Sequence, residues 1–180
     1  MTSEEEFLIL VDETDHAIGY ESKRRCHQNG GMLHRAFSIL LFNEQKQLLI
    51  QKRSHKKLLW PLYWSNSVCS HPRKDESYEI AATRRLSEEL QCEAELVFLF
   101  KFRYQAMFDK ISAENEICAV YIGKVQGQIV ANPDEIAAWK YITLEELNRS
   151  LLTDAALYTP WFQMEWEHIR QFYRHAIHKL

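Results

Sequence analysis

The stretch Glu76-Ser-Tyr-Glu-Ile-Ala-Ala-Thr-Arg-Arg-Leu-Ser-Glu-Glu-Leu90 has the pattern of an amphipathic helix. Apolar residues recur in it at intervals of four and form one stripe: Tyr78, Ala82, Leu86 and Leu90. At about 100° per residue, Glu89 returns to this stripe, whereas Glu88 falls off it. A carboxylate directed at the core is costly unless it is paired or bound to a metal. Glu89 therefore predicts either an ion pair with Arg85, one turn earlier, or a metal site.

Extended segments flank this helix on both sides. Apolar runs bounded by turn residues predict strands over 7–11, 17–20, 34–42, 48–52, 97–104 and 116–125. Thr143 and Glu146 have the spacing of a capping box, and Thr159-Pro160 precedes a final helix. The buried face of that helix is expected to carry Phe162, Trp166, Ile169, Tyr173 and Ala176. Strands mixed with a few helices indicate an α/β or α+β sandwich.

Length and charge limit what the chain can be. With 180 residues, 46% of them hydrophobic and 26% charged, it has the size of one globular domain spanning 1–180. A net charge of −3 argues against a chain-wide binder of nucleic acid or membrane, so an anionic ligand requires a local basic cluster. The acidic start and the short apolar run after it do not resemble a signal peptide, and the four scattered cysteines indicate thiols. We expect a cytoplasmic protein.

Several polar residues lie at positions that the sequence pattern predicts to be buried, and a bound metal ion would explain them. Glu114 and Glu116 lead into an apolar run, and in a strand both carboxylates lie on one face. Like charges repel there unless a cation lies between them, although a frayed strand end in water is an alternative. His27, His34 and His71 are candidates to complete the site, because imidazole is a common ligand of transition metals. A lone histidine is more often structural, and no spacing rule brings these three together.

Four motifs stand at wide intervals along the chain: Ser65-Asn-Ser-Val-Cys-Ser-His-Pro72, Arg84-Arg-Leu-Ser-Glu-Glu-Leu90, Phe102-Arg-Tyr104 and Glu114-Asn-Glu116. Together with His27 and the segment His34-Arg-Ala-Phe-Ser, they resemble the type 1 isopentenyl-diphosphate isomerases. The resemblance runs from near residue 7 to Pro160-Trp161, and the first motif with the downstream Glu-Asn-Glu is its most specific part.

The helix itself is similar to the Nudix box G-x5-E-x7-R-E-U-x-E-E-x-G-U in altered form. Ser70 stands at its first glycine and Gln91 at its late glycine, which leaves the end of the helix undetermined. Arg85 replaces a glutamate that pyrophosphate-cleaving Nudix enzymes generally use to bind metal. This exchange favours anion binding over hydrolysis. The resemblance implies a Nudix-like α/β/α sandwich with a mixed sheet and an added C-terminal helix.

The resemblance also implies a set of site residues. One divalent ion, zinc, manganese or magnesium, would be held by His27, His34, His71, Glu114 and Glu116. A second ion, Mg²⁺ bridging to the substrate diphosphate, would lie at Glu89 and the Cys69 carbonyl. The diphosphate would contact Lys23, Arg53, Lys57 and Arg85. The implied catalytic group is Cys69, Glu116 and Tyr104, with Trp161 beside the hydrocarbon.

These groups suit the interconversion of isopentenyl and dimethylallyl diphosphate. Protonating the unactivated alkene produces a tertiary carbocation, so the reaction needs an acid on one face, a base on the other, and no water. An indole face stabilises a nearby cation by roughly 0.5–2 kcal/mol. Simpler interpretations are core packing for Trp161, an inert buried thiol for Cys69 and a solvated loop for Lys56 and Lys57.

Two other functions compete with isomerisation. The first is hydrolysis of a nucleoside diphosphate derivative, against which Arg85 counts. The second is a non-enzymatic module that binds diphosphate or metal, against which the joint presence of Cys69, Tyr104 and Glu116 counts. The expected partners are small isoprenoid diphosphates, without nucleic acid or membrane, and we expect a monomer or a weak homodimer.

Overall fold

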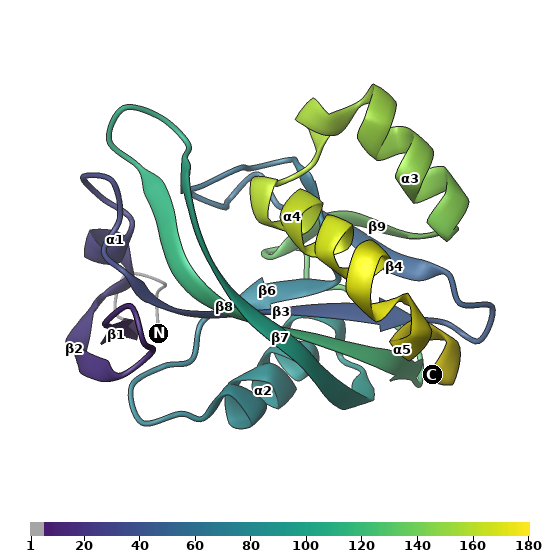
Figure 1. The fold of residues 1–180 in the computed structure, drawn as a ribbon, viewed down its shortest axis with the longest axis horizontal. Coiled ribbons are helices and arrows are strands. Elements are labelled where there is room, and N and C mark those ends of the chain that lie inside the picture. The colour runs from purple at the N-terminus through teal and green to yellow at the C-terminus, as the bar shows by residue number, and fades with distance from the viewer. Residues whose placement is uncertain (1–5) are drawn as a thin grey trace.

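The computed structural model describes residues 6–180, so the acidic segment 1–5 lies outside it. The described residues form a nine-stranded mixed sheet with helices on both faces (Figure 1). The strands are β1 (Phe7–Val11), β2 (Ala17–Ser22), β3 (His34–Phe42), β4 (Leu48–Arg53), β5 (Trp64–Ser65), β6 (Val68–Ser70), β7 (Glu93–Met107), β8 (Ala113–Gln126) and β9 (Ile136–Ile142). The helices are α1 (Lys23–Cys26), α2 (Tyr78–Leu90), α3 (Leu144–Thr153), α4 (Pro160–His168) and α5 (Arg174–Lys179). Among these helices none is long and apolar enough to cross a bilayer.

Strand β3 lies at the centre of the sheet. It pairs in parallel with β8 and antiparallel with β1, β4 and β6. The register with β8 places His34 opposite Glu116 and Phe42 opposite Lys124. Layers of side chains cover both faces of β3, so nearly all of its residues are buried. This burial on two sides explains why most residues of the strand are apolar.

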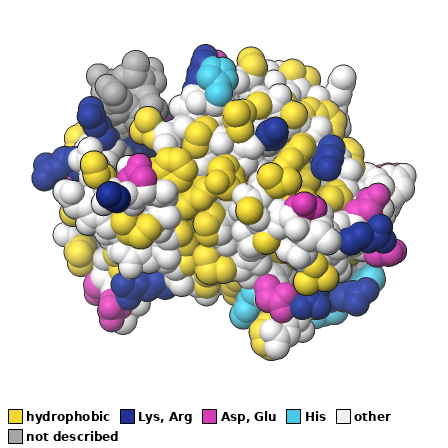
Figure 2. Space-filling model, turned by 90° about the horizontal axis from the view of Figure 1, so that it is seen from above, with side chains coloured by type: hydrophobic (Ala, Val, Ile, Leu, Met, Phe, Trp, Pro, Cys, Tyr) yellow, Lys and Arg dark blue, Asp and Glu magenta, His cyan; other side chains and the backbone are white. Residues whose placement is uncertain are grey.

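The two faces of the sheet pack against different helices. Phe37 and Ile39 of β3 belong to a buried cluster with Leu86 of α2. Leu40, whose side chain points to the opposite face, belongs to a second cluster with Phe162 of α4. The predicted α/β/α sandwich with a mixed sheet and a C-terminal helix is confirmed. Seen from above, hydrophobic side chains gather across the middle of the molecule, and many charged ones lie nearer its edge (Figure 2).

Helix α2 carries the predicted stripe on its buried side. It begins at Tyr78, two residues later than the sequence pattern indicated, because Ser77 is its N-cap and accepts a hydrogen bond from the Ile80 N–H. Glu89 is fully buried and Glu88 is only partly so, as the helical spacing predicted. Gln91 closes the helix in the left-handed conformation, with φ of 49°, and its N–H donates to the Ser87 carbonyl.

The C-terminal part departs from the prediction in two ways. The capping box at Thr143 and Glu146 is present, but β9, which was not predicted, precedes it and pairs with β4. The final helix is interrupted by a π-helical turn at Ile169–Tyr173. This turn inserts extra backbone, so Ile177 rather than Ala176 becomes the fully buried residue of the last segment.

Candidate functional site

Three backbone connections bring the predicted histidines together. His27 follows α1, and its carbonyl accepts a hydrogen bond of 2.9 Å from the Ala113 N–H at the start of β8. His34 begins β3 directly opposite Glu116 of β8. His71 follows β6, which pairs with β3. Each histidine therefore owes its position to a different contact across the sheet.

Gly31 makes the close approach between α1 and β8 possible. Its φ is +82°, and an added Cβ would lie 3.0 Å from the Asn115 Cβ and 3.3 Å from the Ala113 carbonyl oxygen. The Asn115 amide donates a 3.1 Å hydrogen bond to the Gly31 carbonyl. A side chain at this position would push the turn away from β8, so glycine is needed for His27 and His34 to converge.

The five predicted metal ligands meet at one place: His27, His34, His71, Glu114 and Glu116. One ligand atom from each lies within 4.8 Å of all the others. The centroids of the three imidazole rings are 5.0–5.3 Å apart. His27 Nε2 lies 2.8 Å from a Glu114 oxygen, and His71 Nε2 lies 2.8 Å from Glu116 Oε1. Such convergence from distant parts of the chain is what a metal centre requires.

Backbone carbonyls orient two of these imidazoles. His27 Nδ1 lies 2.6 Å from the Lys23 carbonyl and His34 Nδ1 lies 2.7 Å from the Met32 carbonyl, which turns each Nε2 inward. Within residues 6–180, the fully buried Nε2 of His34 has no hydrogen-bond partner, and it lies 3.4 Å from Glu116. A buried imidazole nitrogen that has no hydrogen-bond partner and lies beside carboxylates is suited to bind a divalent cation directly.

Burial and neighbouring charges set the protonation of the cluster. Burial lowers the pKa of His71 well below its usual range, and His34 acts in the same direction. Burial also disfavours protonation of His27, but the Glu114 carboxylate outweighs it and raises that pKa to about 8. Burial opposes ionisation of Glu116, yet the neighbouring His34 imidazole brings its pKa below the usual value. Neutral His71 and ionised Glu116 are the forms that bind metal.

The cluster lies in the wall of a cleft with a volume of about 1010 Å³. Most of the other predicted site residues also line this cleft: Lys23, Arg53, Lys57, Cys69, Arg85, Tyr104 and Trp161. His34 and Glu89 are fully buried behind its surface. The structure thus brings all thirteen predicted residues into one region, while the role of each stays a prediction.

Arg53 contacts both the Cys69 thiol and the Trp161 indole in the cleft. Its Nη1 donates to Cys69 Sγ at 3.4 Å, and its Cζ lies 5.2 Å from the centroid of the Trp161 ring. The Leu59 and Trp60 carbonyls hold the guanidinium, accepting hydrogen bonds of 2.9 and 3.1 Å. Burial raises the pKa of Cys69 to about 11, so the thiol keeps its proton at neutral pH. The protonated Cys69 thiol therefore lines the cleft beside the Arg53 guanidinium.

The ion pair between Arg85 and Glu89 that the helical spacing predicted is present. Arg85 donates two hydrogen bonds to Glu89 Oε1, at 3.0 and 2.6 Å, and its guanidinium also pairs with Glu88 and Glu135. Arg85 nevertheless lines the cleft, so the ion pair and an anion-binding role are compatible. Lys57 also pairs with Glu135, and its side chain is only 18% exposed, whereas the Lys56 side chain is 57% exposed. The alternative of a solvated loop therefore fits Lys56 but not Lys57.

Sequence reasoning missed three residues of this region. Glu135 lies in a polar turn before β9, where no periodic pattern exists. Asn66 falls inside a quoted motif without an assigned role, and its Oδ1 accepts the Trp161 indole N–H at 3.2 Å. Glu165 is fully buried on α4, and its spacing of four from Trp161 could have revealed it.

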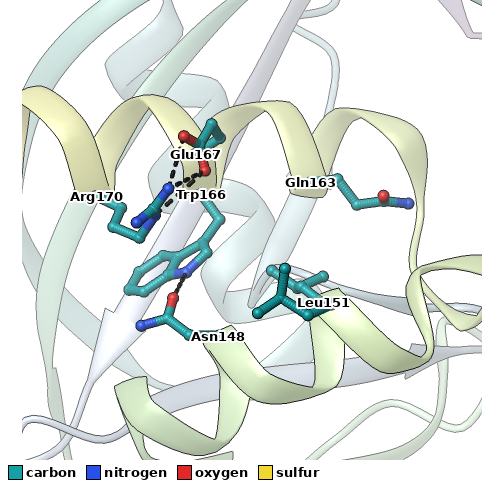
Figure 3. A pocket seen from close by; sticks show the side chains of 7 residues that line it. Asn148, Leu151, Gln163, Trp166, Glu167 and Arg170 are labelled. Carbon is teal, nitrogen blue, oxygen red and sulfur yellow. Dashed lines mark hydrogen bonds and ion pairs between the residues drawn. The ribbon is translucent and has the colours of Figure 1, made fainter.

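A second pocket of about 310 Å³ lies between α3 and α4 (Figure 3). Its polar side chains have partners: the Trp166 indole donates a 2.8 Å hydrogen bond to Asn148, Arg170 pairs with Glu167, and the Gln163 amide donates to two backbone carbonyls. None of the predicted site residues lines this pocket. The predicted site residues therefore lie at the large cleft and not at this second pocket.

Comparisons with known proteins agree with this arrangement. Residues 32–162 match the model of the NUDIX domain. The chain is 40% identical over 168 residues to isopentenyl-diphosphate delta-isomerase 1 of Photorhabdus laumondii subsp. laumondii, covering 92% of this chain and 96% of that protein. It is 36% identical to isopentenyl-diphosphate delta-isomerase of Schizosaccharomyces pombe, covering 91% and 81%.

Solved structures have the same fold. A protein of Deinococcus radiodurans superposes with a TM-score of 0.73 at 26% identity, covering 93% of this chain and 99% of the other. A MutT NUDIX hydrolase of Burkholderia pseudomallei superposes with a TM-score of 0.62 at 18% identity, covering 77% and 98%. The chain therefore belongs to the NUDIX domain family and, within it, to the isopentenyl-diphosphate delta-isomerases.

Proposed function

We propose that the chain interconverts isopentenyl diphosphate and dimethylallyl diphosphate in isoprenoid biosynthesis, through proton addition and removal by way of a tertiary carbocation. The observation that carries this proposal is the meeting of Cys69, Tyr104 and Glu116 with a five-ligand cluster in one cleft. The names of the relatives support the same activity.

The cluster is proposed to hold one divalent ion, zinc, manganese or magnesium. Three imidazole nitrogens and two carboxylates suit such an ion, and the unpaired Nε2 of buried His34 supports it. When bound, the ion supplies positive charge that offsets Glu114 and Glu116 and tunes their acidity. The chain's own contribution is to hold these groups rigidly, away from water.

The diphosphate is proposed to lie against the basic residues of the cleft: Lys23, Arg53, Lys57 and Arg85. Because the chain has a net negative charge, this local cluster is what can attract the anion. Glu89 and the Cys69 carbonyl would hold a Mg²⁺ ion, which would supply positive charge to offset that of the diphosphate. A planar guanidinium at Arg85 can give two parallel hydrogen bonds to a phosphate.

Cys69 and Glu116 are proposed to act on opposite faces of the alkene, one as acid and the other as base. One adds a proton to the terminal alkene carbon. The other removes a proton from the carbon next to the diphosphate-bearing one. Tyr104 donates a hydrogen bond to Glu116 and adjusts its basicity. The Trp161 indole face stabilises the carbocation between these two steps.

Turnover in heavy water tests the reaction type. With isopentenyl diphosphate and Mg²⁺, the protein should form dimethylallyl diphosphate that carries solvent deuterium, and the diphosphate should stay intact. The products are measured by nuclear magnetic resonance and by a phosphate assay. Release of inorganic phosphate without deuterium in the allylic product would indicate a hydrolase. Binding without turnover would indicate a non-enzymatic module.

Four expectations from the sequence stay predictions: one domain over 1–180, a cytoplasmic location, no nucleic-acid or membrane partner, and a monomer or weak homodimer. The oligomeric state is measurable by sedimentation at several protein concentrations. We propose that isoprenoid diphosphates are the ligands of the cleft.

A further inference from the structure

Three of the four cations that are predicted to contact the diphosphate already have a carboxylate partner in the same cleft. Lys23 Nζ lies 3.1 Å from Glu6 Oε2. Lys57 Nζ pairs with Glu135 Oε2, and Arg85 Nη2 lies 3.1 Å from Glu135 Oε1. Both Glu6 and Glu135 line the cleft together with these cations. A diphosphate that enters the cleft therefore meets cations whose charge is already offset by carboxylates.

Each nitrogen of the Arg85 guanidinium has a carboxylate neighbour. Nε and Nη2 donate to Glu89 Oε1 at 3.0 and 2.6 Å, Nη1 donates to Glu88 at 3.0 Å, and Nη2 also faces Glu135. The Glu89 side chain is only 1% exposed, and Glu88 is also held at 3.0 Å by Arg84, which does not line the cleft. Glu135 is 23% exposed and makes a single contact with the guanidinium. It is therefore the partner of Arg85 that a phosphate oxygen can replace most easily.

Backbone hydrogen bonds fix the place of the Glu135 carboxylate at the cleft. The Ser54 N–H, just after β4, donates a 2.9 Å hydrogen bond to the Glu135 carbonyl. The Glu135 N–H donates to the Asn132 carbonyl at 3.0 Å, and the Asn132 N–H donates to the Glu89 carbonyl of α2 at 2.8 Å. The turn that carries Glu135 is thus attached to β4 on one side and to α2 on the other. Its side chain can rotate away from the cations while its backbone stays in place.

We infer that Glu135 is an internal competitor of the diphosphate: its carboxylate binds Lys57 and Arg85 in the empty cleft and is displaced from them when a diphosphate binds. The inference rests on the function proposed above, because it takes isoprenoid diphosphates as the ligands. Substrate and product carry the same diphosphate, so tighter binding of that group does not accelerate the chemical step and slows release of the product. A competing carboxylate lowers the affinity for both. Arg53 donates to carbonyls and a thiol instead, so it can contact the diphosphate without displacing a charged group.

The variant Glu135→Gln tests the competition with inorganic pyrophosphate as the probe. Glutamine keeps the shape of the side chain but not the charge that holds the two cations. Titration calorimetry in the presence of Mg²⁺ should give a Kd for pyrophosphate that is about 10-fold lower than in the unchanged protein, because the cations no longer have to be released from a carboxylate. The inhibition constant of pyrophosphate and the KM for isopentenyl diphosphate should fall in the same direction. The kcat should not rise, since the gain is in binding that substrate and product share.

Two further variants separate displacement from a general change of charge. Asp134→Asn is the matched control, because Asp134 precedes Glu135, lines the same cleft and pairs with Lys56, which is not a predicted contact of the diphosphate. It removes the same charge and should change the Kd for pyrophosphate less than twofold. Glu135→Asp keeps the charge but is one methylene shorter, so it should pair with one cation only and give an intermediate Kd. Because its charge remains paired, it also provides the test if Glu135→Gln does not fold.

Three results would overturn the inference. Weaker binding of pyrophosphate by folded Glu135→Gln would show that Glu135 holds the two cations in place for the ligand, and an unchanged Kd would show that it does not compete. Equal tightening in Asp134→Asn would show only a general effect of charge. Absence of pyrophosphate binding in every variant would reject the predicted diphosphate site together with the inference. Failure to convert isopentenyl diphosphate while pyrophosphate binding follows the expected order would reject the proposed activity alone.

Discussion

Tyr104 and Glu116 are register partners on β7 and β8, and the Tyr104 hydroxyl donates a 2.5 Å hydrogen bond to Glu116 Oε2. The other oxygen, Oε1, faces His71 at 2.8 Å and His34 at 3.4 Å. Burial raises the pKa of Tyr104 well above its usual value, and Glu116 acts in the same direction, so the phenol stays a donor. One oxygen of Glu116 therefore faces the histidines of the metal cluster, and the other accepts the Tyr104 hydrogen bond. Variants of the two residues can test these two contacts separately.

Glu116→Gln and Tyr104→Phe should separate these two roles. Glu116→Gln should lower kcat by at least about 10²-fold, because a positioned acid–base group is lost, and should also reduce bound metal. Tyr104→Phe removes only the hydrogen bond to Oε2, so kcat should fall while metal content stays unchanged. Steady-state kinetics and elemental analysis of the same samples measure both. Full metal loss in Tyr104→Phe would contradict this division.

His71→Ala should lower the metal content of the purified protein, since one of the five converging ligands is removed. Chelation should abolish turnover, and re-addition of a divalent ion should restore it. His16→Ala is the matched control, because His16 has a side chain that is 79% exposed and lies outside the cluster. Elemental analysis measures the bound metal. Equal metal content in all three proteins would argue against the cluster as the binding site.

Arg85→Lys should raise KM for isopentenyl diphosphate with a modest loss of stability. Lysine keeps the charge but loses the planar fork, so a two-point contact to phosphate disappears. Arg84→Lys is the matched control, because Arg84 is the preceding residue and pairs with Glu76 at 2.8 Å instead of lining the cleft. Kinetics and thermal unfolding measure the two effects. A KM that does not change in Arg85→Lys would leave only the ion pair with Glu89.

Glu135 should make stability depend on pH in the acid range. Burial opposes its ionisation, but Lys57 and Arg85 outweigh this and lower its pKa to about 2. The folded pKa is below the ordinary value of 4.5, so this contribution is complete above about pH 4.5 and is lost as the pH falls toward 2. When the pH is lowered from 7 to 3, the free energy of unfolding measured in urea should fall less in Glu135→Gln than in the unchanged protein. Asp134→Asn, at a 68% exposed neighbour, should leave the slope unaltered.

Gln91→Gly should stabilise the fold. Gln91 ends α2 with φ of 49°, a conformation that costs an L residue roughly 1–2 kcal/mol and glycine nothing. Glycine also increases the entropy of the unfolded chain, so the net gain should be about 0.5–1 kcal/mol. Gln91→Ala keeps an L residue and should give no gain. Thermal unfolding of the three proteins decides the matter.

Local pattern determined much of this protein. The helical spacing around Glu89 predicted a buried carboxylate, and Thr143 with Glu146 predicted the capping box that the structure contains. The strongly apolar run over 34–42 predicted a strand, which the structure contains as β3. These features depend on residues a few positions apart, where the geometry of a helix or strand fixes which way each side chain points. The family resemblance then supplied the candidate residues.

Tertiary structure alone decided how the site is assembled. His34 meets Glu116 because β3 and β8 pair in parallel across more than eighty residues of sequence, and nothing in either strand encodes that register by itself. Glu135 and Asn66 gained importance only from what folded around them, which is Lys57 and Arg85 for Glu135 and the Trp161 indole for Asn66. Pairing between distant strands is selected by the burial of the whole apolar surface, which no short window of sequence contains.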